Sequence, residues 1–363
     1  MTRIAVVFGT RPEAIKLGPV VAEVRRADAM VSLCCTGQHT DLLHGTPAET
    51  DLSGGDSLGW GAAGQDPMTW VEQHLEAMGH WMEATEPTAC IVQGDTASAY
   101  VAALSAVQHG VPVLHIEAGV RSGDVKNPWP EEMIRRQITR FADWHYASTD
   151  RCALNLANEG VPADRIVITG NPVVSAMHRY ALGPGVLAPW PPENRLLFTM
   201  HRREWLDQGL AHVLRCLQAL CSVVREFPDL EIQWPMHPAV RKVLSETRIF
   251  QPSAFPRLHI TDPLPYREAI LSLATCLGVA TDSGGLQEEA CTLGIPCAVL
   301  RYATDRPESV EAGRAQMYDP TPDGIRAAIR TLASDHGMPR TPSDIYGTAD
   351  SAKHIASHLL SIV

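Results

Sequence analysis

Long apolar runs, an excess of positive charge and paired cysteine motifs are all missing from this 363-residue sequence. No stretch approaches the ~18 uninterrupted apolar residues that a membrane-spanning helix needs, which argues against an integral membrane protein. Lys and Arg total 30 against 41 Asp and Glu, and the resulting formal charge of -11 would repel a phosphate backbone over most of the surface. A nucleic-acid partner is therefore not expected, but a local cationic pocket for a small anion stays open.

The cysteines and the first residues indicate a cellular compartment. The nine cysteines include no Cys-x-x-Cys pair, and their spacing does not suit a structural zinc site. The opening apolar run, Ile4–Phe8, breaks at Gly9 and is too short for the core of a signal peptide, so we interpret it as a buried first strand. We expect reduced, mostly buried thiols in a cytoplasmic protein without a bound metal.

Short apolar runs alternate with amphipathic stretches almost from end to end. This pattern is typical of parallel strands joined by helical crossovers, and it predicts an α/β fold. At roughly 150 residues per domain, the length predicts two domains. The predicted strands are Ile4–Phe8, Val31–Cys35, Ala89–Val92, Val113–Ile116, Trp144–Ala147 and Ile166–Ile168, followed by Arg195–Thr199, Glu231–Trp234, Leu258–Ile260, Leu277–Ala280 and Cys297–Leu300.

We place the domain boundary near Asn171–Ser175. Tyr180–Asn194 is rich in Pro and Gly and lacks periodicity, so it is interpreted as a linker or an exposed entry to the second domain. The predicted domains span residues 1–172 and 173–348, and residues 349–363 are expected to form a helix that returns to the first domain.

Ligands of open α/β sheets bind beyond the carboxyl ends of the strands, so polar residues there carry more weight. Gly9 and Thr10 follow the first strand and open a helix, and free N–H groups with Arg11 and Lys16 would suit a phosphate oxygen. A capped helix with solvated charges explains this segment equally well.

A second strand-to-helix turn contains two consecutive glycines. Ser283, Gly284 and Gly285 follow the strand Leu277–Ala280, and their backbone amides can approach a diphosphate closely. A plain helix cap explains the serine but does not need the glycines. Glu289, nearly two turns further on, can accept both hydroxyls of a ribose.

Cations and carboxylates follow other predicted strands. His201 and Arg202 follow Arg195–Thr199 and suit an anion or a proton transfer, and Arg306 adds another cation. Asp95 and Glu117 close two successive strands. A single Asp there is commonly a helix cap, but two acids at matching positions, with Glu131 as a third, favour acid–base chemistry on a sugar.

The motifs of this sequence, taken in their order along the chain, resemble those of the non-hydrolysing UDP-N-acetylglucosamine 2-epimerases. The likeness runs from Ile4 to about Leu332 through GTRPEAIK, TGQH, GDT, EAGVRSGD, PWPEE, TGN, HRRE, TDSGGLQEEA and RPE. It implies two Rossmann-like domains that face each other across a cleft, as in GT-B glycosyltransferases, and a homodimer. It also implies interconversion of UDP-GlcNAc and UDP-ManNAc without a cofactor, by elimination of UDP to 2-acetamidoglucal and re-addition.

The resemblance also assigns roles to individual residues. Its implied diphosphate site comprises Arg11, His201, Ser283, Gly284, Gly285 and Arg306, with the ribose on Glu289. Its implied catalytic groups are Asp95, Glu117 and Glu131, with Lys16 and His201. Which acid serves which face of the sugar stays open.

Several positions depart from the family pattern. Ile134 stands where an Asn is usual, and Pro172 stands in place of the usual Thr. Many members are activated by a second substrate molecule, which a Gln and an Arg bind. In this chain Asp41 stands in place of the Gln, and there is no arginine across Asp51–Trp70. Within that segment, Asp51–Pro67 is expected to be a mobile loop. We therefore expect weak or absent substrate activation. The retained part of that second site is Gln38, Arg202 and His237.

Two other functions remain open. A GT-B glycosyltransferase with a UDP-sugar donor would have a similar nucleotide site but would need an acceptor. A catalytically silent UDP-sugar sensor would not need all three acids.

Overall fold

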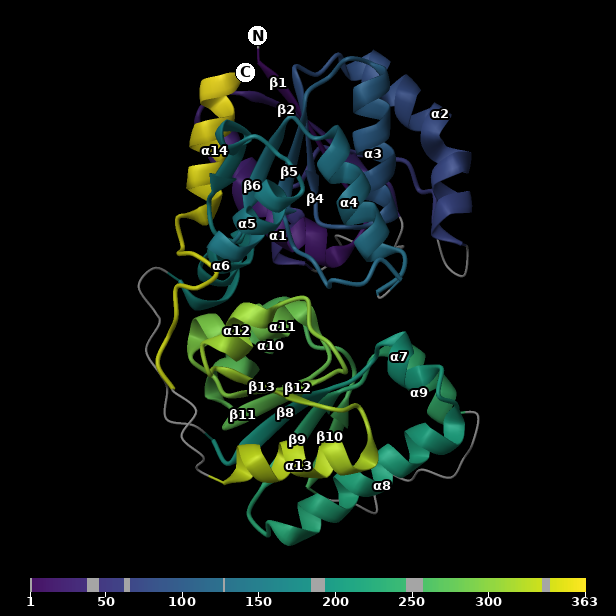
Figure 1. The fold of residues 1–363 in the computed structure, drawn as a ribbon, viewed down its shortest axis with the longest axis vertical. Helices are drawn as coiled ribbons and strands as arrows, with labels where there is room; N and C mark the ends of the chain where they lie inside the picture. The colour runs from purple at the N-terminus through teal and green to yellow at the C-terminus, as the bar shows by residue number, and fades with distance from the viewer. Residues whose placement is uncertain are drawn as a thin grey trace. The chain divides into compact units, whose positions relative to one another are not determined.

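The computed structural model describes residues 2–37, 46–61, 66–126, 128–183, 193–245, 257–334 and 340–363. The chain forms two compact units, one of Met1–Tyr180 with Tyr346–Val363 and the other of Ala181–Ile345. Each is a parallel sheet with helices on both faces (Figure 1). The predicted α/β fold is confirmed, and all eleven predicted strands are present.

Among the described residues, the first unit contains seven parallel strands in the order β3-β2-β1-β4-β5-β6-β7. Its strands are β1 (Arg3–Phe8), β2 (Met30–Cys35), β3 (Asp56–Ser57), β4 (Ala89–Gln93), β5 (Val113–Ala118), β6 (Trp144–Ala147) and β7 (Ile166–Ile168). Its helices are α1 (Arg11–Arg26), α2 (Pro67–Thr85), α3 (Ala97–Gln108), α4 (Glu131–Phe141), α5 (Asp150–Asn158), α6 (Pro172–Met177) and α14 (Ser351–Ile362), with short 3-10 turns η1 (Pro47–Glu49) and η2 (Ala163–Arg165).

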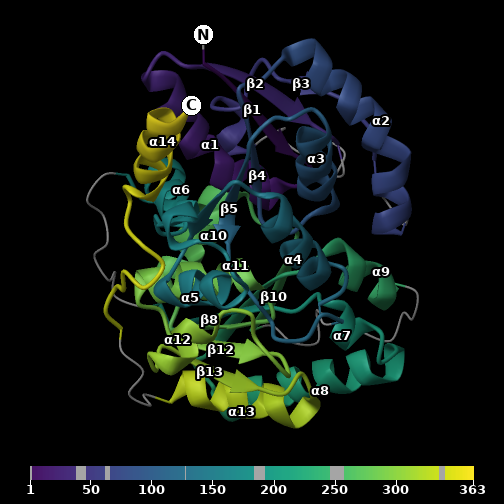
Figure 2. The ribbon, with the colours of Figure 1, turned by 45° about the horizontal axis from the view of Figure 1, so that its top comes forward.

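The central strand β1 is buried on both faces, as its unbroken apolar run predicts. Because side chains alternate along a strand, Ile4, Val6 and Phe8 pack with α1 and α14. Ala5 and Val7 pack on the other face with α2 and α3, which lie side by side in Figure 2.

The C-terminal helix and α6 extend the first unit. Both α6 and α14 pack against α1, and the backbone N–H of Asn171 donates to the carbonyl of Tyr346. The chain leaves this unit after Tyr180, and not near Asn171–Ser175, because α6 belongs to its packing. The π-helix η3 (His178–Leu182) begins at the end of α6.

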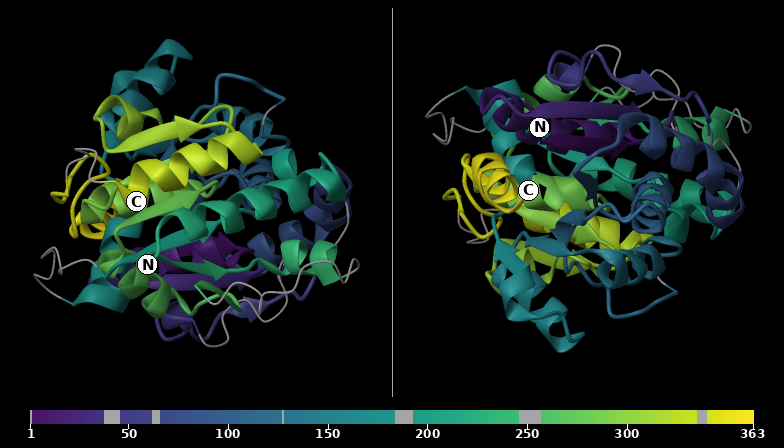
Figure 3. Two further views of the ribbon diagram at one scale, coloured as in Figure 1. Left: turned by 90° about the horizontal axis from the view of Figure 1, so that it is seen from below. Right: turned by 90° about the horizontal axis from the view of Figure 1, so that it is seen from above.

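In the part of the second unit that the structure describes, six parallel strands follow the order β10-β9-β8-β11-β12-β13. Its strands are β8 (Arg195–Thr199), β9 (Glu231–Pro235), β10 (Leu258–Thr261), β11 (Gly278–Thr281), β12 (Cys297–Leu300) and β13 (Ala315–Tyr318). Its helices are α7 (Arg203–Leu206), α8 (Leu210–Glu226), α9 (Pro238–Ser245), α10 (Tyr266–Thr275), α11 (Gly284–Leu293), α12 (Pro307–Glu311) and α13 (Pro322–Ala333). One face packs against α8 and α13, which are neighbours in the left view of Figure 3.

The strand order reverses once in each sheet. In the first sheet the chain runs outward from β1 and returns to β4 on the other side of β1, and β8 and β11 repeat this arrangement in the second sheet. Crossovers on either side of such a point cover opposite faces, which leaves the carboxyl ends of the two strands open to a ligand. The turns after β1, β4, β8 and β11 are therefore the expected site positions.

The sequence prediction missed β3 and β13. Both are short and contain polar residues, so they lack the apolar run that marks a strand. Asp51–Pro67 was expected to be a mobile loop, but this segment contains β3. Asp51 at its start is buried, and Arg179 and Tyr180 both donate to the Asp51 carboxylate. Most of the predicted linker, residues 184–192, lies outside the described residues.

No helix within the described ranges is long and apolar enough to cross a membrane.

Two buried histidines predict how the stability of the first unit depends on pH. His115 on β5 and His145 on β6 are paired across the sheet, and burial lowers the pKa of each to about 4, from 6.5. Between these values each histidine binds fewer protons in the folded state than in the unfolded state, so the contribution of the histidines to the free energy of unfolding falls as the pH falls. Each histidine contributes up to ~1.4 kcal/mol per pH unit.

Urea denaturation between about pH 7 and pH 4.5 measures this slope. In His145→Gln the slope is expected to fall by about half of the histidine contribution, because one of the two groups is gone. His354→Gln removes an exposed histidine on α14 and should leave the slope unchanged. An unchanged slope in His145→Gln would show that His145 is not the titrating group.

Candidate active site

Lys16 and Glu117 form a buried ion pair in the first unit. The Lys16 Nζ lies 2.6 Å from the Glu117 Oε2, and the two side chains are 11% and 5% exposed. The Gln93 amide donates to the same oxygen. This pair joins α1 to the end of β5, so two of the predicted catalytic residues are in direct contact.

Glu117 has an unusual backbone conformation. Its φ is +64°, in the left-handed region that disfavours residues with a Cβ, and the pairing of β5 with β6 shifts register between Ile116 and Ala118. Such a conformation costs roughly 1–2 kcal/mol and occurs most often at functional sites. The shift turns the Glu117 carboxylate toward Lys16 at the carboxyl end of the sheet.

Asp95 follows β4, next to Glu117 in the strand order, and it does not cap α3. That role belongs to Thr96, whose Oγ accepts the N–H of Ala99. The Asp95 Oδ2 accepts from Nε and Nη2 of Arg135 at 2.7 and 2.6 Å, and its side chain is 26% exposed. Asp95 is therefore held in place while it remains accessible to a substrate.

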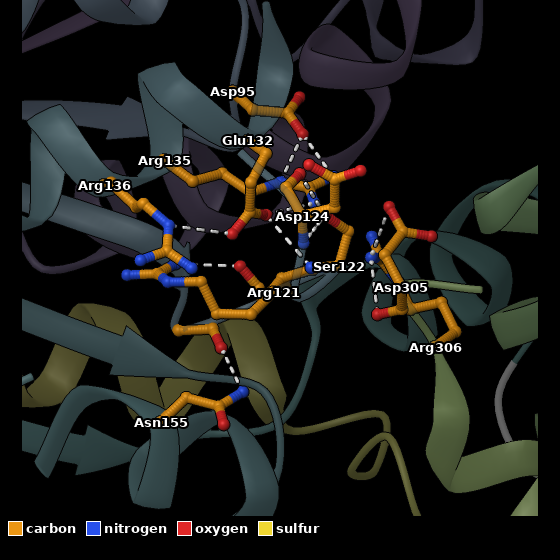
Figure 4. Close-up of polar contacts among 12 residues, drawn as sticks. Asp95, Arg121, Ser122, Asp124, Glu132, Arg135, Arg136, Asn155, Asp305 and Arg306 are labelled. Atoms are coloured by element: carbon orange, nitrogen blue, oxygen red, sulfur yellow. Dashed lines mark hydrogen bonds and ion pairs between the residues drawn. The ribbon is translucent and has the colours of Figure 1, made fainter. Parts of the chain in front are cut away.

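Arg135 belongs to a buried ionic network (Figure 4). Glu132 is fully buried and accepts from the Ser122 N–H at 3.0 Å, Arg136 Nε at 3.1 Å and Arg135 Nη1 at 3.3 Å. The network supports Asp95 from α4 and holds the chain after β5.

Glu131 is among the catalytic residues predicted from the sequence, whereas Glu132 and Arg135 are not. Glu131 is the first residue of α4 and is only partly buried. The signal for the other two was present, since Glu132 has arginines three and four residues later, on one face of a helix.

The helix N-terminus after β1 is already occupied. The Glu13 Oε2 accepts the N–H groups of Gly9 at 3.0 Å and Thr10 at 2.8 Å. These two N–H groups are therefore bonded within the chain. Arg11, exposed in the first turn of α1, stays a candidate for contact with an anion.

In the second unit, Asp282 organises the turn after β8. Its Oδ2 accepts the N–H groups of His201 and Arg202 at 2.6 and 2.7 Å, and its Oδ1 lies 3.0 Å from the His201 Nδ1. Burial alone would raise the pKa of this carboxyl, but the contacts with His201 and the two N–H groups lower it below the ordinary value. Asp282 thus fixes the backbone and the ring of His201. This role was not predicted from the sequence, because Asp282 was interpreted only as part of the glycine motif.

The N-terminus of α11 presents two glycines. Ser283 is its cap and accepts the Leu286 N–H. A methyl group on Gly284 would meet nothing closer than 3.8 Å, with Arg306 Cζ at 3.9 Å and Arg202 Nη2 at 4.0 Å, and one on Gly285 would meet nothing within 4 Å. The fold therefore does not require glycine at either position, although glycine costs a helix about 1 kcal/mol relative to alanine.

Arg306 is buried beside α11. Its Nε donates to Glu288, and its Nη1 lies 3.4 Å from the Asp305 Oδ2. Glu289 is buried one residue after Glu288. Within this unit the structure thus gathers Arg202, Arg306, Ser283 and both glycines, and it orients His201 on the neighbouring strand end.

The remaining family departures have local explanations. Ile134 is buried in the core between α3 and α4, and Pro172 is the first residue of α6, where its missing N–H costs nothing. His237 stacks on His201 with ring centroids 5.1 Å apart. Gln38 and Asp41 lie outside the described residues.

Comparisons with known proteins point to one family. A family model described as UDP-N-acetylglucosamine 2-epimerase matches residues 22–360. The chain is 36% identical over 351 residues to a probable UDP-N-acetylglucosamine 2-epimerase from Ralstonia solanacearum, with 92% of each chain covered. Its structure resembles that of UDP-GlcNAc 2-epimerase from Neisseria meningitidis bound to UDP-GlcNAc, with a TM-score of 0.88, 29% identity and coverage of 99% of this chain and 100% of that chain.

A more distant likeness concerns the fold alone. The lipopolysaccharide outer core galactosyltransferase WaaB matches with a TM-score of 0.57 and 12% identity over 100% of each chain. The fold of this chain is GT-B-like, with parallel sheets of seven and six strands.

Proposed function

Because the chain belongs to the UDP-N-acetylglucosamine 2-epimerase family, we propose that it catalyses the reversible epimerisation of UDP-GlcNAc to UDP-ManNAc at C2 of the sugar. The relative from Neisseria meningitidis was solved with UDP-GlcNAc bound. The proposal rests on that family membership and on the two half-sites, each of which carries groups that this reaction needs.

The two glycines of α11 are the main support for the proposed diphosphate site. Neither glycine is needed by the backbone or by neighbouring side chains, so a closely approaching ligand is the remaining physical reason for them. Free N–H groups at the N-terminus of a helix favour an anion, and Arg202 and Arg306 add positive charge beside Gly284. We assign the UDP diphosphate to Ser283, Gly284, Gly285, His201, Arg306 and Arg11, and the ribose to Glu289.

The chemistry explains why carboxylates and cations are both required. The hydrogen at C2 is not next to a carbonyl and is only weakly acidic, so departure of UDP must run ahead of its removal. Cations around the diphosphate stabilise the leaving group as the C1–O bond breaks. A carboxylate then takes the C2 proton and leaves 2-acetamidoglucal, whose planar C2 can be protonated from the opposite face before UDP adds back to C1.

We assign the proton transfers to Asp95, Glu117 and Glu131. The contacts of Lys16 and Gln93 hold the Glu117 Oε2, and Arg135 holds the Asp95 Oδ2. Carboxylates held in this way keep their direction toward a substrate through both half-reactions. Lys16 supplies positive charge beside Glu117, and His201 is oriented by Asp282 for contact with UDP.

The homodimer remains a proposal that follows from the family resemblance, and the cytoplasmic location remains a proposal that follows from the cysteines. All nine cysteines are free thiols, which is typical of a reducing compartment. Light scattering is expected to give twice the chain mass of 39.5 kDa, and a value equal to one chain would contradict the dimer.

The reaction itself is tested in D2O. Incubation with UDP-GlcNAc alone, followed by NMR at C2, is expected to give UDP-ManNAc with deuterium at C2, because the proton lost to a carboxylate is replaced from solvent. A glycosyltransferase without an acceptor gives neither product nor exchange, and a sensor only binds.

The same experiment tests the acids. Asp95→Asn keeps the shape of the side chain but cannot accept a proton, so the rate of deuterium exchange should fall by about 10²–10⁴. Asp262→Asn, at a side chain that is 89% exposed, is the control and should exchange at the normal rate. Near-normal exchange in Asp95→Asn would remove Asp95 from the mechanism.

The variant Gly284→Ala distinguishes an effect on ligand binding from an effect on the stability of the fold. The added methyl group has room in the protein, so the thermal midpoint should stay equal or rise. The same methyl lies where the diphosphate must approach, so calorimetry should show UDP binding weakened by about tenfold or more. Unchanged UDP affinity with unchanged stability would contradict this placement of the diphosphate.

A further inference from the structure

Glu13 is a buried carboxylate that the proposed mechanism does not use. It lies in the first turn of α1 and is 2% exposed. Its Oε2 accepts three bonds, from the N–H of Gly9 at 3.0 Å and from the N–H and Oγ of Thr10 at 2.8 Å each. Its Oε1 accepts the hydroxyl of Thr96 at 2.7 Å.

These four bonds join two separate turns. Gly9 and Thr10 form the turn after β1, whereas Thr96 caps α3 and directly follows Asp95 in the turn after β4. A helix cap accounts for the bonds near Thr10, but it does not account for the bond to Thr96, which is 83 residues away in the sequence. Glu13 therefore links the two strand ends between which the order of the sheet reverses.

The two turns are also tightly packed against each other. A methyl group on Gly9 would lie 1.9 Å from the Ser98 Oγ and 2.4 Å from the Thr36 Oγ1, so only glycine fits there. Ser98 belongs to the first turn of α3, which Thr96 caps. A change in the separation of the turns would consequently displace Asp95 as well.

We propose that Glu13 is a positioning residue for the epimerisation, which holds the turn after β1 and the turn after β4 at one separation and thereby sets the position of Asp95. The inference rests on the proposed function, because it deepens the role of Asp95 in it. Glu13 touches no reacting atom in this account, and it acts through Thr96.

The state of this link depends on pH. Burial raises the pKa of Glu13 to about 7 from 4.5, and the bonds from Thr96, Gly9 and Thr10 oppose the rise. The ionised carboxylate accepts all four bonds. The protonated carboxyl must donate from one oxygen. A proton on Oε1 leaves the three bonds at Oε2 intact, so the Thr96 Oγ then accepts and the hydrogen bond between the turns reverses its direction.

Three other titratable groups surround Glu13 and its link. Cys35 at the end of β2 has a raised pKa, caused by burial and, in smaller part, by the charge of Glu13. Lys16, one turn later on α1, is engaged with Glu117. Asp95, beyond Thr96, is engaged with Arg135.

Glu13→Gln is the variant that tests the inference. The glutamine oxygen can accept the three bonds at Gly9 and Thr10, and its NH₂ can donate to Thr96, which reproduces the protonated arrangement at every pH. At about pH 8 its kcat should be about fivefold to tenfold below that of the wild type, the size of one altered buried hydrogen bond, and at about pH 6 the two should be equal. Groups that titrate in both proteins cancel in this ratio.

Thr96 variants and a matched control complete the test. Thr96→Val should lower kcat at both pH values, and Thr96→Ser, which keeps the hydroxyl, should restore it to within about twofold. Glu23→Gln alters a partly exposed glutamate on the same helix, which is paired with the exposed Arg26, and it should behave as the wild type. The Kd for UDP should stay unchanged in all variants, because the assigned diphosphate ligands are not altered.

The outcomes separate the inference from the proposed function. If the wild type does not epimerise UDP-GlcNAc, the proposed function fails. If the wild type is active and Glu13→Gln matches it at about pH 8, or its deficit is the same at both pH values, the positioning role of Glu13 is wrong. Should Glu13→Gln not fold, a kcat in Thr96→Val equal to that of the wild type would also overturn the inference.

Discussion

Charge must be balanced where parallel strands end, and the rest of each site depends on this constraint. The strand ends of both sheets carry ionised groups that are largely removed from water, where an unpaired charge is costly. In the first unit every such group described above has an opposite charge or several donors, as in Lys16 with Glu117, Asp95 with Arg135, and Glu13 with the turn at Thr10. These pairings fix the directions of the carboxylates.

The two units solve the problem of the helix N-terminus in different ways. Before α1 the N–H groups of Gly9 and Thr10 are bonded to a side chain of the helix that follows, Glu13. In α11 a serine caps the helix and two glycines leave the adjacent space open, with arginines nearby. The same strand–turn–helix geometry therefore serves acid positioning in one unit and suits anion binding in the other.

Much of this arrangement was predictable from local sequence. Unbroken apolar runs predicted eleven of the thirteen strands in the described residues, because strands buried on both faces must be apolar throughout. The order of motifs directed attention to the strand ends, and there Lys16 and Glu117 proved to be in contact. The misses were residues whose role depends on partners far away in the sequence: Glu13, whose contact with Thr96 no local pattern shows, and Asp282, whose hydrogen bonds reach His201 and Arg202.

By itself, the sequence determined the α/β class, the family and the kinds of groups available for chemistry, since these follow from periodicity, motif order and residue type. Only the tertiary structure decided which of these groups are already engaged. Whether an N–H group at a strand end is free for a phosphate depends on whether a buried carboxylate reaches it first, and that is a matter of packing between turns. For this reason the turn before α1 already binds a carboxylate of its own chain, whereas the turn before α11 has space beside its two glycines.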